Sequence, residues 1–515
     1  MNNQLKLLDC TLRDGGYINN WEFGNRKIKA IIEGLTNSGI DIVEIGFLRD
    51  EESKADRTVW NQVKEIKDKL PDDKGNTMFS VMILNGSYNV DSLEPYDVSG
   101  PDMVRVTFHN YDIDEGLELC KKIINKGYKV SCNPINIMGY SDAELLELLE
   151  KINKIHPYVF SIVDTFGSMT SKDLERMVSL VDHNLEAGIG IGLHLHENMA
   201  QSYALAQMFL QKHLCRNVII DASLVGMGRI PGNLPIELIS NYLNDYFEKN
   251  YSIDGLLDLI EAYIIPIKKE HEWGYSPVYF LSAKNNLHRN YAEYLLNKGN
   301  LTHKDVNHIL SRITPEHKAV FSAEYADELY HEYLNHCIDD TKARAILTEL
   351  LHGQRVMLLA PGNTLNTCSE TIDKYINNNK PVVISINFVP DRYPVDYVFL
   401  SNAKRYGLVK RTNCKKITTS NLNVDSDYQV NYNSLSGAFP QGTNGLVMVL
   451  KLLSDLQVKL VVLAGADGYR MEGNYYDNSL RSFTNHDIHY NAEVTEAIRK
   501  INIMVEFLTP SLYDR

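Results

Sequence analysis

Residues 5 to about 228 repeat one pattern, in which a short apolar run precedes a longer segment that mixes charged and apolar residues. An apolar run predicts a strand buried on both faces, and the mixed segments predict amphipathic helices. The pattern occurs eight times, which favours a (β/α)8 TIM barrel over an open doubly wound sheet. The predicted strands are Leu5–Leu12, Ile40–Leu48, Met78–Leu84, Met103–Phe108, Tyr128–Ile137, Tyr158–Phe166, Ile189–His196 and Val218–Val225.

The pattern changes after the eighth unit. Residues 240 to about 350 lose the strand periodicity and predict helices, which break around Pro266, Pro277 and Pro315. A second alternation starts at Arg355 and predicts a smaller Rossmann-like α/β domain. Its predicted strands begin at Arg355 and cover Val382–Phe388, Tyr397–Leu400 and Leu460–Ala464. We therefore predict three domains: a barrel over 1–240, a helical extension over 241–353 that completes the active site, and an α/β domain over 354–515.

Charged and imidazole side chains follow the predicted barrel strands. Arg13 and Asp14 precede a glycine pair at the end of the first run, and Glu44 lies near the end of the second. His194 and His196 are two residues apart on the seventh run, so they point to the same side of a strand. Because the carboxyl ends of barrel strands meet at one rim, these positions are expected to converge.

One carboxylate and two neutral imidazoles form a facial set of ligands for a divalent cation and leave positions open for a substrate. We predict that Asp14, His194 and His196 bind this metal. Asn233 is a fourth candidate ligand, although it could instead cap the helix predicted after Pro235. Oxygen ligands that complete the coordination shell favour Mn2+, with Mg2+ or Co2+ as alternatives, over a closed zinc site.

Composition restricts the partners and the compartment. The 515 residues have a formal net charge of -14, which argues against nucleic acid or an anionic membrane as the main partner. No apolar run approaches the length of a membrane span, and no signal peptide is apparent. The seven cysteines form no CxxC pair, which is typical of reduced thiols. A cytoplasmic protein is expected.

Three motifs together resemble the DRE-TIM metallolyase superfamily. They are Leu12-Arg13-Asp14-Gly15, the His194 and His196 pair, and Gly232-Asn233 followed by Glu237. The resemblance covers about residues 5 to 285 and is nearest to the 4-hydroxy-2-oxovalerate aldolase branch of class II pyruvate aldolases. It implies that Asp14, His194 and His196 bind the metal, that Asn233 completes the shell, and that Arg13 stabilises an enolate oxygen.

The sequence departs from that branch at its catalytic histidine, three residues after the metal-binding aspartate, where this chain has Tyr17. Tyrosine has an ordinary pKa near 10 and is a poor general base, so the base is left open. The resemblance places Tyr275 or Tyr279 near the substrate, and we take Arg13, Tyr17, Glu44 and Tyr279 as the candidate catalytic residues. The reactive cysteine of the related lyase has no counterpart in residues 226–233.

The resemblance implies a carbon-carbon lyase that makes or cleaves a 4-hydroxy-2-oxo acid, from pyruvate and an aldehyde, through a metal-bound enolate. A sugar-derived aldehyde and a homo-oligomer are further expectations. The alternatives are a Claisen-type acyl-CoA synthase or lyase and a non-catalytic metabolite-binding protein. The role of the C-terminal domain is open. Its turn at Pro361-Gly362 either cradles a phosphate through backbone N–H groups or is an ordinary turn.

Overall fold

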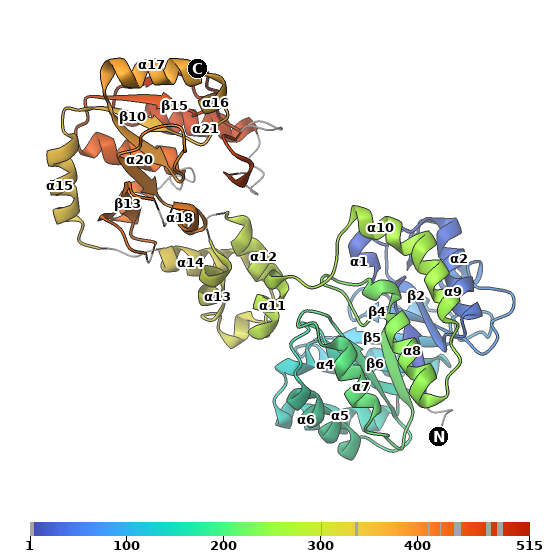
Figure 1. The fold of residues 1–515 in the computed structure, drawn as a ribbon. Coiled ribbons are helices and arrows are strands. Elements are labelled where there is room, and N and C mark those ends of the chain that lie inside the picture. Colours follow the sequence, from blue (N-terminus) through green and yellow to red (C-terminus); the bar gives the residue numbers. More distant parts are fainter. Residues whose placement is uncertain are drawn as a thin grey trace. The chain divides into compact units, whose positions relative to one another are not determined.

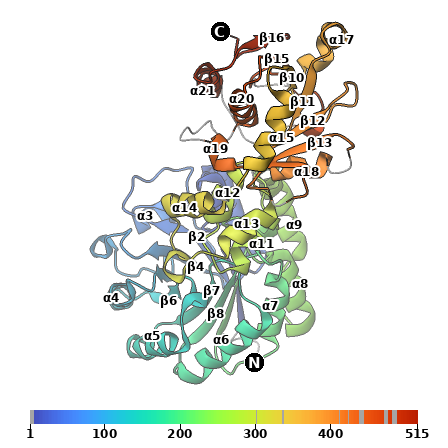
Figure 2. The same cartoon turned by 90° about the vertical axis from the view of Figure 1, so that its left-hand side faces the viewer.

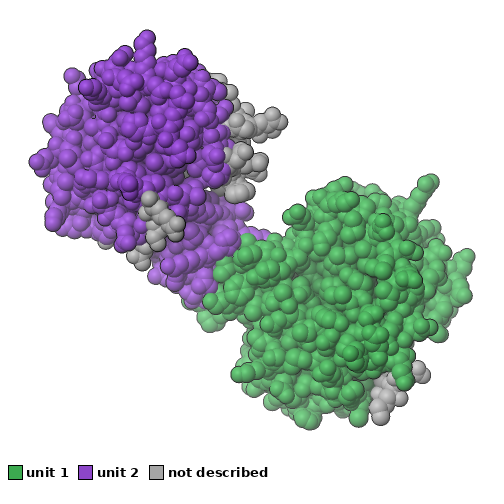
Figure 3. Space-filling model, in the orientation of Figure 1, with its two compact units in different colours: residues 1–289, 314–321 green, residues 290–313, 322–515 purple. Residues whose placement is uncertain are grey.

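The computed structural model separates into two compact units, which Figure 3 shows in green and purple. Unit 1 comprises residues 1–289 and 314–321, and unit 2 comprises residues 290–313 and 322–515. The structure describes residues 5–299, 301–334, 338–409, 412–422, 424–436, 444–469, 475–480 and 488–514.

Unit 1 contains a closed barrel of parallel strands, as the sequence predicts. Within the described residues, eight strands follow the order β1-β9-β8-β7-β6-β5-β4-β2, and β1 pairs with β2 to close the ring. The short β3 adds to β2 outside this ring. The strands are β1 (Leu5–Asp9), β2 (Ile42–Leu48), β3 (Val59–Trp60), β4 (Met78–Leu84), β5 (Met103–Phe108), β6 (Lys129–Pro134), β7 (Val159–Asp164), β8 (Gly190–Leu195) and β9 (Val218–Ala222).

The first strand is shorter than the apolar run that predicted it. The backbone N–H groups of Arg13 and Asp14 both donate to the carbonyl of Cys10, at 3.2 and 2.8 Å, so the chain turns directly after β1. Cys10 and Leu12 remain fully buried in this turn, which explains why the apolar pattern continues past the strand. Arg13 and Asp14 therefore lie in the loop after β1 and not on the strand itself.

Helices cover the outside of the barrel, and Figure 2 shows several of them around strands β6 to β8. In α2, Ile28, Ile31, Ile32 and Leu35 are buried at the spacing of one helix face. The helices of unit 1 are α1 (Gly16–Asn19), α2 (Asn25–Asn37), α3 (Val63–Lys67), α4 (Ile113–Asn125), α5 (Asp142–Ile155), α6 (Ser171–Asn184), α7 (Ser202–Leu210), α8 (Ile236–Phe247), α9 (Ile253–Leu259), α10 (Ile265–Glu270) and α11 (Pro277–Lys284). Short 3-10 turns lie at Val90–Ser92, Ile137–Gly139, Leu224–Gly226 and Pro315–His317, and Ile260–Ile264 forms a π turn.

Unit 2 contains a second parallel sheet, which confirms the α/β prediction. Its order is β14-β13-β12-β11-β10-β15-β16. Figure 1 labels β10, β13 and β15 of this sheet. The strands are β10 (Arg355–Leu359), β11 (Val382–Ile386), β12 (Tyr397–Leu400), β13 (Lys415–Thr419), β14 (Tyr428–Val430), β15 (Leu460–Ala464) and β16 (Val505–Phe507). The sequence pattern missed β13, β14 and β16. They are short and partly polar, because they lie at or near the two edges of the sheet.

The helices of unit 2 are α12 (Asn290–Asn297), α13 (His303–Leu310), α14 (Ala323–Leu334), α15 (Thr341–Leu351), α16 (Thr364–Thr367), α17 (Ser369–Asn379), α18 (Ala403–Val409), α19 (Tyr432–Ser436), α20 (Gly445–Asp455) and α21 (Ile488–Arg499), with a 3-10 turn at Asn478–Leu480. The predicted breaks at prolines occur where helical segments begin: Pro277 is the first residue of α11 and Pro315 opens a 3-10 turn.

The boundaries of the two compact units differ from the predicted domain boundaries at residues 240 and 353. Helices α8 to α11 belong to unit 1, whereas α12 to α15 belong to unit 2, and residues 314–321 return to unit 1. Whether residues 241–353 fold as a domain of their own stays a prediction. No helix in the described ranges is long and apolar enough to cross a membrane. Six cysteines in those ranges are free thiols, and Cys337 lies outside them.

Candidate metal centre and cavity

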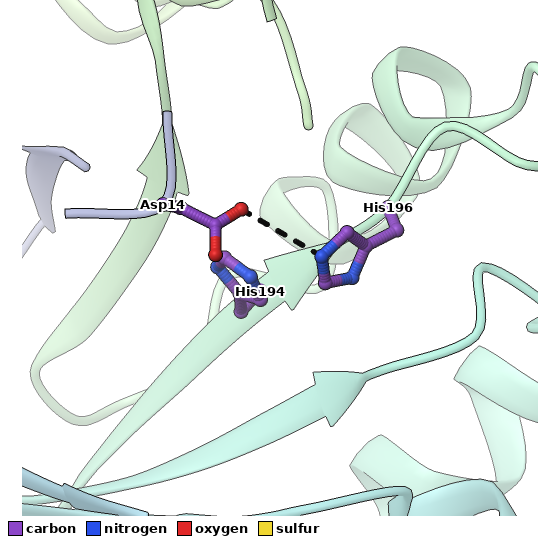
Figure 4. A group of neighbouring side chains, drawn as sticks. All are labelled: Asp14, His194 and His196. Carbon is purple, nitrogen blue, oxygen red and sulfur yellow. Dashed lines mark ion pairs between the residues drawn. The ribbon is translucent and has the colours of Figure 1, made fainter. Parts of the chain in front are cut away.

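Three predicted ligands converge at the carboxyl end of the barrel. Each of Asp14, His194 and His196 offers one ligand atom, and these atoms lie within 4.8 Å of one another. Figure 4 shows the Asp14 carboxylate facing both imidazoles, with His194 on β8 and His196 in the segment that follows. The residues are only 2%, 4% and 8% exposed. The cluster is therefore buried beneath the rim.

Hydrogen bonds orient both imidazoles. His194 Nδ1 lies 3.0 Å from Asp221 Oδ2, and His196 Nδ1 lies 3.0 Å from the backbone carbonyl of Asp164. Because a carbonyl oxygen only accepts, His196 carries its proton on Nδ1 and keeps a lone pair on Nε2. That Nε2 atom is buried without a hydrogen-bond partner among the described residues, 3.7 Å from Asp14 Oδ2. This is how a metal-binding histidine is usually held.

Asn233 lies next to the same carboxylate. Its Nδ2 donates to Asp14 Oδ2 at 2.7 Å, while its buried Oδ1 has no hydrogen-bond partner in the described part of the chain. Helix α8 begins at Ile236, its N-cap residue is Pro235, and no side chain caps it. The alternative of a helix cap therefore does not account for Asn233.

These observations test whether the residues fit a divalent cation. The donor set comprises a carboxylate oxygen, two imidazole nitrogens and an amide oxygen, and two of these atoms, His196 Nε2 and Asn233 Oδ1, are buried without a partner in the described chain. An unpaired buried acceptor is costly unless a ligand satisfies it. The residues therefore fit a hard or borderline divalent ion.

A chain of ion pairs runs beneath the cluster. Arg13 contacts Asp14 through Nη1 and Glu44 through Nε, the latter at 2.8 Å. Arg105 reaches the same Glu44 oxygen at 3.0 Å and also contacts Asp221, which holds His194. Three buried carboxylates thus face two guanidinium groups, so this group of residues carries one excess negative charge when the histidines are neutral. A divalent cation offsets that excess.

The same contacts shift the pKa of the acidic groups. Burial alone raises the pKa of Asp14, but the Arg13 guanidinium holds it well below its ordinary value. Burial likewise opposes ionisation of Asp221, yet Arg105 and His194 lower its pKa. Burial lowers the pKa of His194. The cluster therefore combines ionised carboxylates with a neutral imidazole, which is the state that binds a metal ion.

A cavity of about 670 Å³ opens above the cluster. Its lining includes Arg13, Asp14, His194 and His196, together with Tyr17 and His288. One wall comes from residues 315 and 318–321, the part of the chain that returns to unit 1 after α13. The volume lies within the usual range for small-molecule sites.

Part of this barrel matches a known protein family. The HMGL-like family model matches residues 103–257, a range that contains His194, His196 and Asn233. The barrel carries an HMGL-like domain. The chain is 22% identical over 285 residues to the 4-hydroxy-2-oxovalerate aldolase of Cupriavidus taiwanensis, covering 52% of this chain and 78% of that protein.

Two solved structures match about half of this chain. The N-terminal domain of an aldolase-like protein from Bacteroides vulgatus has 27% identity and a TM-score of 0.48, covering 57% of this chain and 96% of that one. The HMG-CoA lyase of Bacillus subtilis has 17% identity and a TM-score of 0.43, covering 53% and 94%.

The other residues that the sequence predicts as catalytic differ in how deeply they are buried in this HMGL-like domain. Tyr17 lines the cavity, is 43% exposed and packs edge-on against Trp21. Glu44 is fully buried and does not line the cavity, so it contacts Arg13 from below. Tyr279 lies half-buried on α11 and Tyr275 is 56% exposed; neither lines the cavity, and their roles stay predictions.

Sequence reasoning missed His288. It lies in the cavity wall, where its Nε2 is 2.7 Å from Arg229 Nη2. Because a guanidinium can only donate, Nε2 accepts and the proton of the neutral ring is on Nδ1. Burial and the charges of Arg229 and Arg289 lower the pKa of His288 to about 4. No periodicity or motif marks this histidine, since it follows α11 in an irregular segment.

Proposed function

We propose that the HMGL-like barrel is a divalent-metal-dependent aldolase that makes or cleaves a 4-hydroxy-2-oxo acid. The observation that carries this proposal is the buried Asp14, His194 and His196 cluster at the floor of a cavity, with the Arg13 guanidinium beside it. The similarity to 4-hydroxy-2-oxovalerate aldolases supports the same reaction class. Pyruvate is the proposed 2-oxo acid, and an aldehyde is the second substrate.

Asp14, His194, His196 and Asn233 would hold the ion, Mn2+ being our first choice. When bound, a divalent ion supplies Lewis acidity toward the oxygens of a 2-oxo acid. Arg13 is already fixed by Asp14 and Glu44, so its positive charge faces the cavity without reorganisation. Such a preorganised charge stabilises an enolate oxygen as the bond between C3 and C4 breaks or forms.

Two neutral side chains are candidates for the aldehyde oxygen. The Tyr17 hydroxyl lies at the exposed side of the cavity, and His288 offers the proton on its Nδ1. Both can donate a hydrogen bond to the 4-hydroxyl or aldehyde oxygen. Because His288 stays neutral near pH 7, we assign it a donor role in holding that oxygen.

An assay of the full chain with pyruvate and a panel of aldehydes tests the proposal. The protein is first treated with a chelator and then supplied with Mn2+, Mg2+ or Co2+. We expect a 4-hydroxy-2-oxo acid only with metal, and deuterium exchange into the pyruvate methyl group without any aldehyde. A Claisen-type activity would instead consume acetyl-CoA in a parallel reaction. Metal binding without exchange in any condition would contradict the aldolase assignment.

A further inference from the structure

The sheet of unit 2 has a topological switch point. The chain begins at β10 and adds β11, β12, β13 and β14 on one side, and then returns to place β15 and β16 on the other side of β10. All of these pairings are parallel. In open parallel sheets, ligands bind in the crevice outside the carboxyl ends of the two strands where the order reverses. Here those strands are β10 and β15.

A cavity of about 250 Å³ lies at this crevice. Residues 360–362 follow β10 directly, residues 465–469 follow β15, and both segments line the cavity. Asn387 after β11 and Ser401 after β12 add polar groups. Every lining residue belongs to unit 2, so the site needs nothing from the barrel. Its volume is small for a ligand site and suits a compact molecule.

The Pro361-Gly362 turn does not itself cradle a phosphate through the amides that the structure describes. The Gly362 N–H donates to the carbonyl of Gly465 at 2.9 Å, and the Thr364 N–H donates to Asp467 at 3.0 Å. A Cβ atom on Gly362 would lie 2.3 Å from the Gly465 carbonyl, so close packing of the two loops explains this glycine. Any anion must be recognised by other groups around the cavity.

The charged groups of the lining differ in their partners. Lys298 pairs with Asp327, and Asp467 accepts hydrogen bonds from Thr364. Arg405 of α18 donates to the backbone carbonyls of Ser479 and Leu480, at 3.1 and 2.5 Å, and has no carboxylate partner within the described ranges. Burying a cation without a counter-charge is unfavourable. Arg405 therefore supplies positive charge that an anionic ligand can neutralise.

Two further features fit the rest of such a ligand. Helix α20 begins at the cavity, and the Leu446 and Val447 N–H groups donate to Oδ1 of its N-cap Asn444, so this end contributes its positive dipole to the same space. Tyr469, Tyr475, Tyr490 and Tyr513 line the cavity, and burial raises the pKa of Tyr469 and Tyr513. Aromatic side chains of this kind pack against a planar ligand ring.

We propose that this crevice binds a mononucleotide, with its phosphate at Arg405 and the N-terminus of α20 and its base among the tyrosines. The combination of a phosphate and an aromatic ring accounts for both the Arg405 guanidinium without a carboxylate partner and the tyrosine lining, whereas a simple anion accounts only for the first. The small volume favours a single nucleotide over a dinucleotide. This site is independent of the aldolase proposal.

The test uses calorimetric titration of the full chain with AMP, GMP, CMP and UMP. We expect at least one nucleotide to bind, its Kd to rise at least about tenfold in Arg405→Gln, and its Kd to be unchanged in Arg392→Gln. Arg392 is the matched control because it is an exposed arginine of unit 2, paired with Asp373. Nucleosides should bind more weakly than the nucleotide. Equal binding of ribose 5-phosphate would overturn the role of the base, and absence of binding by all four nucleotides would overturn the proposal.

Hydrogen exchange of the wild-type chain provides a second measurement, which is needed if Arg405→Gln does not fold. The nucleotide that binds tightest should protect amides in segments 360–369, 401–409 and 465–469. Protection confined to residues 5–289 would place the nucleotide in the barrel and would refute the site.

Discussion

The two units place cavities at equivalent positions but line them with different charged groups. Both cavities lie at the carboxyl ends of parallel strands, one in a closed barrel and one at the switch point of an open sheet. In the barrel, Asp14, Glu44 and Asp221 outnumber Arg13 and Arg105. In unit 2, the one acidic residue of the lining, Asp467, accepts hydrogen bonds from Thr364, and Arg405 has no acidic partner among the described residues.

This difference shows that strand topology determines where a ligand binds, whereas the charge at the strand ends determines which ligand. Excess negative charge and unpaired imidazole and amide acceptors favour a metal ion in the barrel. An unbalanced guanidinium favours an anion in unit 2. Substitutions of Asp14, Arg13, His288 and Tyr17 all alter the barrel side of this comparison. All three tryptophans, Trp21, Trp60 and Trp273, lie in unit 1, so their fluorescence reports on the barrel alone.

The largest effect is expected for Asp14→Asn. It removes the one carboxylate among the proposed ligands and abolishes the excess negative charge, so bound metal should be lost and aldolase turnover should fall by on the order of 10³-fold. Metal content is measured by mass spectrometry and folding by tryptophan fluorescence. Asp114→Asn, an exposed carboxylate on α4, is the control and should keep its metal. Full metal content in Asp14→Asn would remove this residue from the site.

Arg13→Lys keeps the charge but loses the planar group that contacts Asp14 and Glu44 together. We expect kcat to fall at least about a hundredfold with metal content retained. Arg49→Lys is the matched control, because Arg49 lines the same cavity but stacks on Trp21 and Phe47. If the two variants lose activity equally, the specific role of Arg13 is wrong.

The pH dependence of the free energy of unfolding tests the lowered pKa of His288. Its folded pKa of about 4 lies below the unfolded value near 6.5, so the unfolded chain takes up the proton first as the pH falls. Stability is therefore fully present above about pH 6.5 and is lost as the pH falls toward 4, by about 3 kcal/mol. Urea unfolding followed by tryptophan fluorescence should show this loss in wild type and in the His156→Gln control, and a smaller loss in His288→Gln. Parallel curves for all three proteins would show that His288 titrates normally.

The smallest effect is expected for Tyr17→Phe, which removes one donor to the aldehyde oxygen. Loss of a single hydrogen bond should slow aldol formation and cleavage by about tenfold. Deuterium exchange into pyruvate should be nearly unchanged, because that half reaction does not involve the aldehyde. Loss of exchange in the variant would instead mean that Tyr17 handles the enolisation proton.

The barrel and its histidine pair could be predicted from sequence because both depend on local periodicity. Eight apolar runs correspond to the eight strands of the closed ring within residues 5–299, and the two-residue spacing of His194 and His196 places both rings on one side. Strands β13, β14 and β16 were missed because they lack a continuous apolar run; β14 and β16 are three-residue edge strands, and β13 is mostly polar.

The sequence by itself determined the order of strands and the identity of the candidate ligands. Only the tertiary structure decided which charges meet: Arg105 and Asp221 come from different strands and join the cluster through Glu44 and His194. The fold likewise brings His288 and residues 315–321 over the cavity. Periodicity specifies which way a side chain faces, but the partner it meets across a barrel depends on closure of the ring, and that information is not local.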